Sequence, residues 1–455
     1  MKKTWVAASL SAWLLGANPA MALDLLHAYE AALSNDPVFR AAVKENEAGQ
    51  ANRVIGRSAV MPKINANYNQ FANDSAISGP LVTNGPSQSI HRAYPSDLLN
   101  VQLTQPLFNL GALAQMRQGM AQGDLSDARF VYNTQDLLVR VLQAYSDVLY
   151  ARDNLAYLVA QRDAYKEQLK VNQRMFERGE GTVTDALETK ASYEMSEAQV
   201  IEANDVLENA KRKLEALIGE PLRSVKEVQP LAANFRITPL MPRAFELWRD
   251  NAMASNAELR ASEHNVEIAR QEYEKQKAGH YPVVSAVAGW GQQKSQNYSA
   301  INQNATNSQI GVQVSVPLFS GGEATGRSSQ ARANYEKSQA ERDQVRDKII
   351  TELRKQYDAV NSSAQKIEAL NRAVESATEL TRAMRKSVQG GQRINLDVLV
   401  ADKGLATAQR DLAQAKYNYM LALLKLKQQA GNLTLEDLEK MALNFRKDQV
   451  AQAKR

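Results

Sequence analysis

The chain has 455 residues, including 22 glycines, 13 prolines and no cysteine, and its formal net charge is +5. The absence of cysteine excludes disulfide scaffolds, thiol nucleophiles, cysteine-bound metal clusters and lipid anchors on cysteine. The low glycine and proline content favours long uninterrupted helices. Because the 55 basic and 50 acidic residues are mixed along the sequence, they indicate solvated helix faces and no nucleic-acid partner.

Residues 1–22 are predicted to be a secretory signal that is cleaved after Ala22. Lys2 and Lys3 precede an apolar stretch from Trp5 to Leu15, and the segment ends in an A-x-A pattern. That apolar stretch is too short to span a bilayer, and no later stretch approaches the length of an apolar membrane helix. We therefore expect an exported protein that enters a membrane, if at all, as β-strands.

The remainder of the chain repeats itself. The segment VQLTQPLF at 101–108 returns as VQVSVPLF at 312–319, a shift of 211 residues, whereas Pro62 corresponds to Pro282, a shift of 220. The first copy therefore has extra residues between Pro62 and Val101, which we expect in a loop because loops tolerate insertions. Two structural repeats are expected, with these bounds: 23–220 (first repeat), 221–242 (linker), 243–431 (second repeat) and 432–455 (tail).

Each repeat is predicted to run in the order helix, strand, loop, strand, very long helix, tight turn, helix. The helices are expected at 24–58, 111–177, 183–218, 243–278, 323–388 and 395–430. In the two longest, apolar residues recur at alternating spacings of three and four, as in coiled coils. At about 1.5 Å per residue, such helices would reach roughly 100 Å, so we expect them to form a column or tube.

Glycine-containing turns are expected to fold the long helices back as antiparallel hairpins, since glycine readily takes a positive φ after a helix end. The turn glycines are Gly179, Gly181, Gly390 and Gly391. Behind the turns, Thr182 or Thr184 in the first hairpin and Asn395 in the second offer N-cap oxygens to the next helix.

Four short segments with alternating polarity are predicted to be strands, at 63–72, 98–108, 282–292 and 309–319. One face would be apolar, and the other would carry Asn65, Asn67, Asn69, Asn100, Gln102, Thr104, Gln313 and Ser315. This alternation suits a barrel with lipid outside and water inside, and it also suits a soluble sheet packed on a helix. Aromatic residues that could form interfacial girdles are Tyr68, Phe71, Phe108, Tyr281, Trp290 and Phe319. Since lipid forbids unpaired strand edges, a membrane barrel would need several chains.

Three motifs carry a resemblance to a known family: the PLFSGG turn at 317–322, the stretch Arg393-x-x-x-Asp397-Val-Leu, and the segment 415–426. Together with the signal and the duplication, they resemble the TolC family of outer-membrane channel-tunnels of Gram-negative bacteria. Members that serve type I secretion of proteases and lipases are the most similar. The resemblance covers nearly all of residues 24–440.

The resemblance implies a mainly α fold with a small β part. Three chains would share one 12-stranded transmembrane β-barrel, above a tunnel of coiled-coil helices that crosses the periplasm. A periplasmic membrane fusion (adaptor) protein and an inner-membrane ABC transporter would be the partners.

The resemblance also implies a gate at the periplasmic tip. Asp397 matches an acidic position whose three copies would ring the axis and favour cations, while Val400 stands where many relatives have a second aspartate. Arg393 matches an arginine that ties its coiled coil to the neighbouring one through the positions of Thr184 and Asp185. The residues alone leave plainer roles open, because acids are common in the first turn of a helix and Arg393 could be a solvated loop charge.

The leading hypothesis is a passive exit duct for a secreted protein. The alternatives are the outer-membrane part of a small-molecule efflux pump and a periplasmic coiled-coil tether without a pore. No enzyme, metal or cofactor is expected, because the histidines are scattered without paired ligand spacing. They are His27, His91, His264 and His280.

Overall fold

The computed structural model describes most of the chain after the predicted signal. The described ranges are 23–80, 87–222, 228–232, 235–296, 302–390, 392–393 and 395–445. The predicted signal at 1–22 lies outside them.

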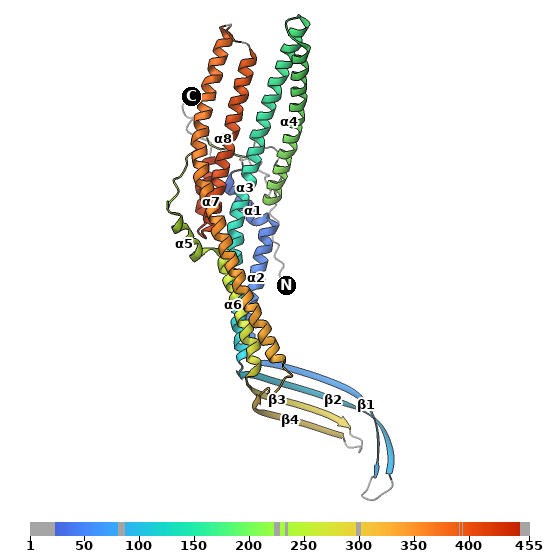
Figure 1. Ribbon diagram of the computed structural model, residues 1–455. Coiled ribbons are helices and arrows are strands. Elements are labelled where there is room, and N and C mark those ends of the chain that lie inside the picture. The colour runs from blue at the N-terminus through green and yellow to red at the C-terminus, as the bar shows by residue number, and fades with distance from the viewer. Residues whose placement is uncertain are drawn as a thin grey trace, which may run out of the picture. The chain divides into compact units, whose positions relative to one another are not determined.

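Helices account for most of the described residues (Figure 1). They are α1 (Leu25–Asn35), α2 (Pro37–Ser58), α3 (Leu110–Glu177), α4 (Val183–Ile218), α5 (Phe245–Ser255), α6 (Ala257–Lys277), α7 (Glu323–Gln389), α8 (Asn395–Gln429) and α9 (Leu435–Ala442). The two longest, α3 and α7, have 68 and 67 residues. No helix in the described ranges is both long enough and apolar enough to cross a membrane.

The two predictions of one continuous helix before each strand pair are wrong. Each helix is interrupted, at Asp36 and at Asn256, where the backbone is extended. The carboxylate of Asp36 accepts the amide of Phe39 at 3.0 Å, and the side-chain oxygen of Asn256 accepts the amide of Leu259 at 2.9 Å. Each polar side chain caps the helix that follows, and an N-cap residue cannot itself be helical.

The four strands form one antiparallel sheet in the order β1-β2-β3-β4 (Figure 1). They are β1 (Lys63–Pro80), β2 (Ser87–Phe108), β3 (Val283–Gln296) and β4 (Asn302–Ser315). The strands of the first hairpin have 18 and 22 residues and those of the second have 14 each. The extra residues of the first copy therefore lengthen the strands, and the expectation that they form a loop is wrong.

The predicted strand ends also need correction. The strands predicted at 63–72, 98–108 and 282–292 continue further toward their hairpin connections, because paired backbone extends beyond the alternating pattern. The strand predicted at 309–319 begins earlier, at Asn302, and ends at Ser315, so residues 316–319 lie outside it.

The chain forms two compact units, each assembled from separate stretches of sequence. Unit 1 consists of the described residues within Met1–Arg40, Thr134–Trp248 and Leu353–Arg455, and unit 2 of those within Ala41–Asn133 and Arg249–Glu352. Each unit draws on both predicted repeats.

The core of unit 1 surrounds Tyr145, a fully buried residue of α3. Its hydroxyl donates to the carbonyl oxygens of Leu23 at 2.9 Å and of Gln229 at 3.1 Å, and its ring makes a T-shaped contact with that of Phe445, with 5.1 Å between centroids. One side chain thus joins the start of the described chain, the interval between the repeats and the C-terminal segment. Buried polar groups need such partners, and Tyr145 satisfies its own while fixing three segments on one helix.

In unit 2, glycines let α2 and α3 approach closely. A Cβ atom added to Gly119 would lie 2.4 Å from the carbonyl oxygen of Asn52, and one added to Gly56 would lie 3.0 Å from the Cα of Gly119. Beside this contact, Arg53 bonds Asp124 at 2.7 Å and Asp127 at 2.8 Å. The helices that precede and follow the first hairpin are therefore held together where they meet the sheet.

Candidate functional site: helix turns and a two-faced sheet

The turn from α3 to α4 closes with a glycine in the left-handed region. Gly179 has φ of 77°, and its amide donates to Phe176 O at 3.0 Å while the amide of Glu180 donates to Met175 O at 2.8 Å. These are the paired bonds of a Schellman helix end, which a residue with a Cβ adopts at a cost. Gly181, the second predicted turn glycine, lies against Met175.

Thr182 and Asp185 cap the start of α4 reciprocally. The hydroxyl of Thr182 accepts the amide of Asp185 at 3.1 Å, and the carboxylate of Asp185 accepts the amide of Thr182 at 3.3 Å. Of the two threonines expected to cap this helix, the structure uses Thr182, and Thr184 lies exposed within the first turn. The capping box supplies a purely structural role for Asp185.

In the turn from α7 to α8, Arg393 and Asp397 lie together, with 3.6 Å between guanidinium and carboxylate. The turn is closed by the bond from the amide of Gln392 to Ser387 O at 2.9 Å and by the amide of Gly390 on Lys386 O at 3.0 Å. Gly391 lies outside the described residues. Asn395 is the first residue of α8, so the expectation that it precedes the helix as its N-cap is wrong.

Among the described residues of one chain, only two of the four predicted gate residues, Arg393 and Asp397, pair with each other. Asp185 is engaged by Thr182, and Arg393 by Asp397. A link from Arg393 to Thr184 or Asp185 stays a prediction about neighbouring coiled coils.

Sequence reasoning missed the contacts that hold each hairpin together near its turn. In the first, the amide group of Asn172 donates to the hydroxyl of Thr189 at 2.7 Å, and Thr189 is buried. In the second, Arg385 donates to both carboxylate oxygens of Asp402, at 3.0 and 3.2 Å. Such pairs join residues 17 apart across a turn, so periodicity within one helix gives no signal for them.

A second missed feature is a ladder of contacts between α8 and α3, which we call the tyrosine ladder. Its members on α8 are Lys403, Arg410 and Tyr417, seven residues apart, and on α3 they are Tyr165, Tyr157 and Asp153. The Nζ of Lys403 donates to the hydroxyl of Tyr165 at 3.0 Å, and the guanidinium of Arg410 lies 4.7 Å from the ring centre of Tyr157. The hydroxyl of Tyr417 donates to Asp153 at 3.4 Å. Seven residues make about two helical turns, so the ladder follows one face of α8.

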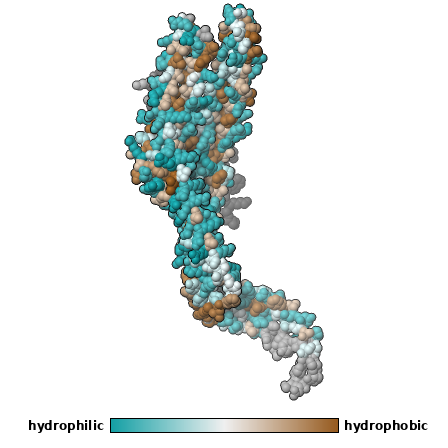
Figure 2. All heavy atoms as spheres, viewed as in Figure 1, coloured by the Kyte–Doolittle hydropathy of each residue, from teal (hydrophilic) through white to brown (hydrophobic). Residues whose placement is uncertain are grey.

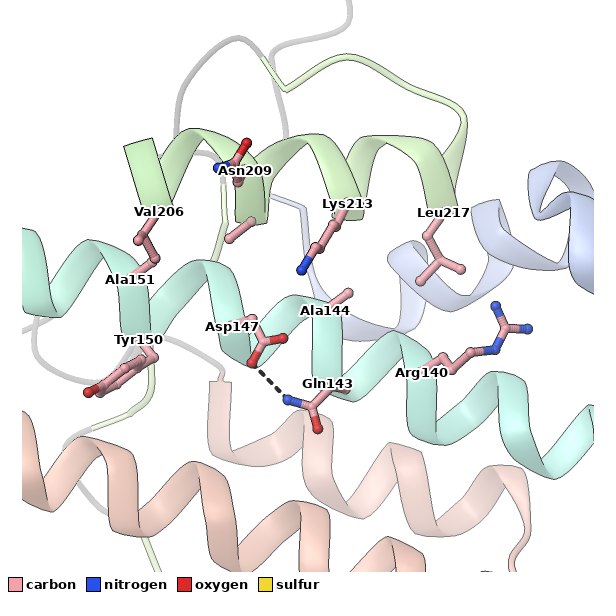
Figure 3. A pocket seen from close by; sticks show the side chains of 11 residues that line it. Arg140, Gln143, Ala144, Asp147, Tyr150, Ala151, Val206, Asn209, Lys213 and Leu217 are labelled. Atoms are coloured by element: carbon pink, nitrogen blue, oxygen red, sulfur yellow. Dashed lines mark hydrogen bonds between the residues drawn. The ribbon is translucent and has the colours of Figure 1, made fainter. Parts of the chain in front are cut away.

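A pocket of about 580 Å³ lies between α3 and α4 in unit 1 (Figure 3). Its lining mixes apolar side chains with the charged Asp147 and Lys213, and Asp147 accepts a hydrogen bond from Gln143 at 2.7 Å. Burial raises the pKa of Asp147, although that hydrogen bond and the positive charges of Lys213 and Lys425 oppose the shift. A single carboxylate balanced by lysine charges needs no ligand to explain it. No group of acidic or histidine side chains in the described ranges could hold a metal ion.

The sheet has one polar and one apolar face, and its register decides which residues share them. Asn65 lies opposite Gln102, which lies opposite Gly289, which lies opposite Gln309. Directly opposed residues share a face, so this row and its neighbours place all eight predicted lumen-facing residues on one side. A hollow of about 240 Å³ lies on the same side, where β3 carries glycines.

The opposite face is apolar near the helices. Its members are Ile64, Ala66, Tyr68, Leu99, Val101, Leu103, Val284, Ala286, Ala288, Trp290, Ile310, Val312 and Val314. Ile310 is 89% exposed and Ile64 68%, and Figure 2 shows hydrophobic surface at this end of the sheet. Further from the helices the face becomes polar, with Asp97 opposite Lys294. An exposed apolar band on a strand face is the pattern of a lipid-facing surface.

The predicted aromatic girdle is only partly on this face. Tyr68, Trp290 and Phe108 share it, whereas Phe71 belongs to the polar face because its number is odd in β1, like that of Asn69. Its placement in the girdle was wrong, since one residue along a strand reverses the side.

Comparison with known proteins identifies the family. The family model described as "Outer membrane efflux protein" matches residues 28–220 and 248–432, which is most of the chain. The chain belongs to this family, to which the sequence resemblance pointed.

Two relatives and one solved structure are similar along nearly the whole chain. Alkaline protease secretion protein AprF of Pseudomonas aeruginosa is 42% identical over 96% of this chain and 91% of its own length. Proteases secretion protein PrtF of Dickeya chrysanthemi is 38% identical over 95% and 93%. The structural alignment with the CmeC outer membrane channel of Campylobacter jejuni covers 98% of each chain, with a TM-score of 0.74 at 15% identity. That likeness confirms the predicted mainly α fold with a small β part.

Proposed function

We propose that three copies of this chain form an outer-membrane exit duct for a secreted protein of the protease class. The observation that carries the proposal is the register of the sheet, which places the amide side chains on one face and the apolar side chains on the other. Four strands with two open edges cannot lie alone in lipid. Twelve strands from three chains would close the cylinder, with the amide face toward water.

The class of cargo follows from similarity. AprF and PrtF are named as protease secretion proteins, and this chain covers more than nine-tenths of each. A duct has no energy source of its own, so an inner-membrane ABC transporter would drive export and a periplasmic adaptor protein would join the two. The coiled-coil hairpins would form the tunnel between them.

The gate of this duct is proposed at the turn from α7 to α8. Three copies of Asp397 around one axis would attract cations and repel anions, and Val400 adds no second ring of charge. Arg393, which pairs with Asp397 in one chain, would also link neighbouring coiled coils when the tip is closed.

Deleting the gene and comparing two phenotypes tests the proposal. We expect the culture medium to lose one or a few secreted proteins, protease activity among them, while sensitivity to antibiotics and detergents stays unchanged. Complementation with the intact gene is the control. Unchanged secretion with increased antibiotic sensitivity would favour a small-molecule efflux channel. A purified protein without conductance in a lipid bilayer, even with an opened gate, would favour a tether.

A further inference from the structure

Within the described part of one chain, each edge strand of the sheet is paired on one side only. β1 lies at one edge and β4 at the other, and the apolar side chains of β4 are among the most exposed in the described ranges. The proposed trimer requires β4 of one copy to pair with β1 of the next, and the inference below rests on that proposal. The trimer by itself leaves open which residues meet at this seam.

The internal repeat relates the two hairpins residue by residue. The shift of 220 carries Lys63 to Val283, and the shift of 211 carries Thr104 to Ser315. In the structure, Lys63 lies opposite Thr104 and Val283 lies opposite Ser315. The two hairpins therefore have the same register, and the repeat holds for backbone pairing as well as for sequence.

The remaining pairing within the chain, between β2 and β3, is then a template for the seam. β2 corresponds to β4, and β3 corresponds to β1. Thr104 lies opposite Val287, and the same shifts carry this pair to Ser315 and Asn67. We infer that β4 of one copy pairs with β1 of the next copy in the antiparallel register that places Ser315 opposite Asn67.

This register keeps the two faces of the sheet continuous across the seam. Ser315 and Asn67 both belong to the polar face. Leu103 opposite Ala288 becomes Val314 opposite Tyr68, and both of these residues belong to the apolar face. A slip by one residue would turn the amide side chains of one copy toward lipid, so only slips by two compete with the inferred register.

The register also accounts for the early end of β4. Its counterpart β2 continues to Phe108, which lies opposite Val284 after an irregularity beyond Pro106. The equivalent pair at the seam is Phe319 with Ile64. In one chain, Val316, Leu318 and Phe319 are 52%, 93% and 89% exposed, since the strand that would pair with them belongs to another copy. Residues 316–319 should therefore become strand when the trimer forms, as the sequence pattern predicted.

Disulfide cross-linking tests the register directly, because the chain contains no cysteine of its own. The full-length variant with Ser315→Cys and Asn67→Cys is expressed in the outer membrane and oxidised. Only directly opposite residues bring their Cβ atoms within disulfide reach. We expect covalent dimers and trimers, several-fold more abundant than with Ser315→Cys combined with Asn65→Cys or Asn69→Cys. A second pair, Phe319→Cys with Ile64→Cys, should also link if the strand extends.

The outcomes separate the register from the proposed function. Stronger linking with Asn65→Cys or Asn69→Cys overturns the register and leaves the trimer intact. No linking from any pair in a trimer that still conducts overturns the inference alone. A protein that stays monomeric before oxidation overturns both. If the first pair links and the second does not, the extension of β4 to Phe319 is wrong.

Discussion

Asp36 has two tasks in unit 1. Its side chain is 4% exposed, caps α2, and bonds the guanidinium of Arg140 at 2.7 Å. Burial alone would raise the pKa of Asp36, but the hydrogen bonds from Arg140 and from the amide of Phe39 outweigh it and hold the pKa below its ordinary value. Asp36 ends α1, caps α2 and bonds Arg140 of α3, so it joins the three helices. A buried charge is costly to leave without a partner.

We predict that Asp36→Ala lowers the free energy of unfolding by about 2–3 kcal/mol, since α2 loses its buried cap and Arg140 loses one of its two carboxylate partners. Chemical denaturation in detergent measures the change. The matched control is Asp136→Ala, which removes a 34% exposed carboxylate that bonds the same guanidinium at 2.7 Å. Equal losses in the two variants would contradict the role assigned to Asp36.

The lowered pKa also predicts the direction of the acid response. Stabilisation by Asp36 is complete above the ordinary carboxyl pKa of about 4 and is lost as the pH falls through the lowered folded-state pKa. In Asp36→Asn this part of the acid sensitivity should disappear, because the amide cannot titrate. An unchanged pH profile would show that other carboxylates dominate.

The side chain of Arg393 is 57% exposed, and its ion pair with Asp397 is therefore largely solvated. An exposed ion pair contributes about 0–1 kcal/mol, so Arg393→Ser should leave the stability of the chain nearly unchanged. We predict a several-fold higher single-channel conductance, because the proposed link between neighbouring coiled coils is lost.

Arg382→Ser is the control for this variant, since Arg382 pairs with Glu379 one turn away on the same helix at 2.9 Å. If both variants conduct like the unmodified protein, Arg393 has no part in closing the tip.

At the scale of elements, the tyrosine ladder joins the two coiled coils of one chain. Lys403 nearest the turn both donates to Tyr165 and lies 5.0 Å from its ring centre, and the hydrogen bond from Lys403 is the main reason why the pKa of Tyr165 is lowered. Tyr417 at the other end is buried. The ladder is thus more exposed near the turn than at its other end. If one hairpin moved away from the other, the contact nearest the turn would separate first.

A double-mutant cycle measures this contact. Tyr165→Ala and Lys403→Ala should each destabilise the chain slightly, with a coupling of about 0.5–1 kcal/mol between them. Chemical denaturation supplies the free energies, and limited proteolysis near the turn should become faster in both variants. Lys166→Ala combined with Lys403→Ala is the control and should be additive. Additive effects for Tyr165 and Lys403 too would show that the contact carries no energy.

Helices and strands could be predicted from the sequence where the pattern of nearby residues is enough to define them. The uninterrupted runs that became α3 and α7 have helix bounds within one residue of the expected ones, since nothing in them breaks a helix. The breaks at Asp36 and Asn256 were missed, although a capping residue stands at each. The decisive contact at Asp36 comes from Arg140, which lies 104 positions along the chain, and no local window contains it.

In the molecule as a whole, the apolar face of the sheet favours lipid and the amide-rich face favours water. In the described part of unit 2, the apolar face near the helices is widely exposed, as at Ile64, Ile310 and Val312, and the polar face carries a hollow. Burial of large apolar side chains contributes about 1.5–3 kcal/mol each, so the ten large side chains among the thirteen on this face give a strong preference for lipid over water. That preference and the two open edges are the physical reasons for proposing a shared barrel.

The long helices, the two-copy plan and the alternation of amide and apolar residues could be predicted from the chain alone, because they depend on spacing along it. Which residues are opposite one another, where the helices are capped, and how Tyr145 and the tyrosine ladder join distant segments became clear from the folded chain. Pairing and burial are set by neighbours far apart in sequence, which no local pattern contains. Under the inferred register, residues 316–319 would follow the same rule beyond one chain, because their proposed neighbour belongs to a second copy.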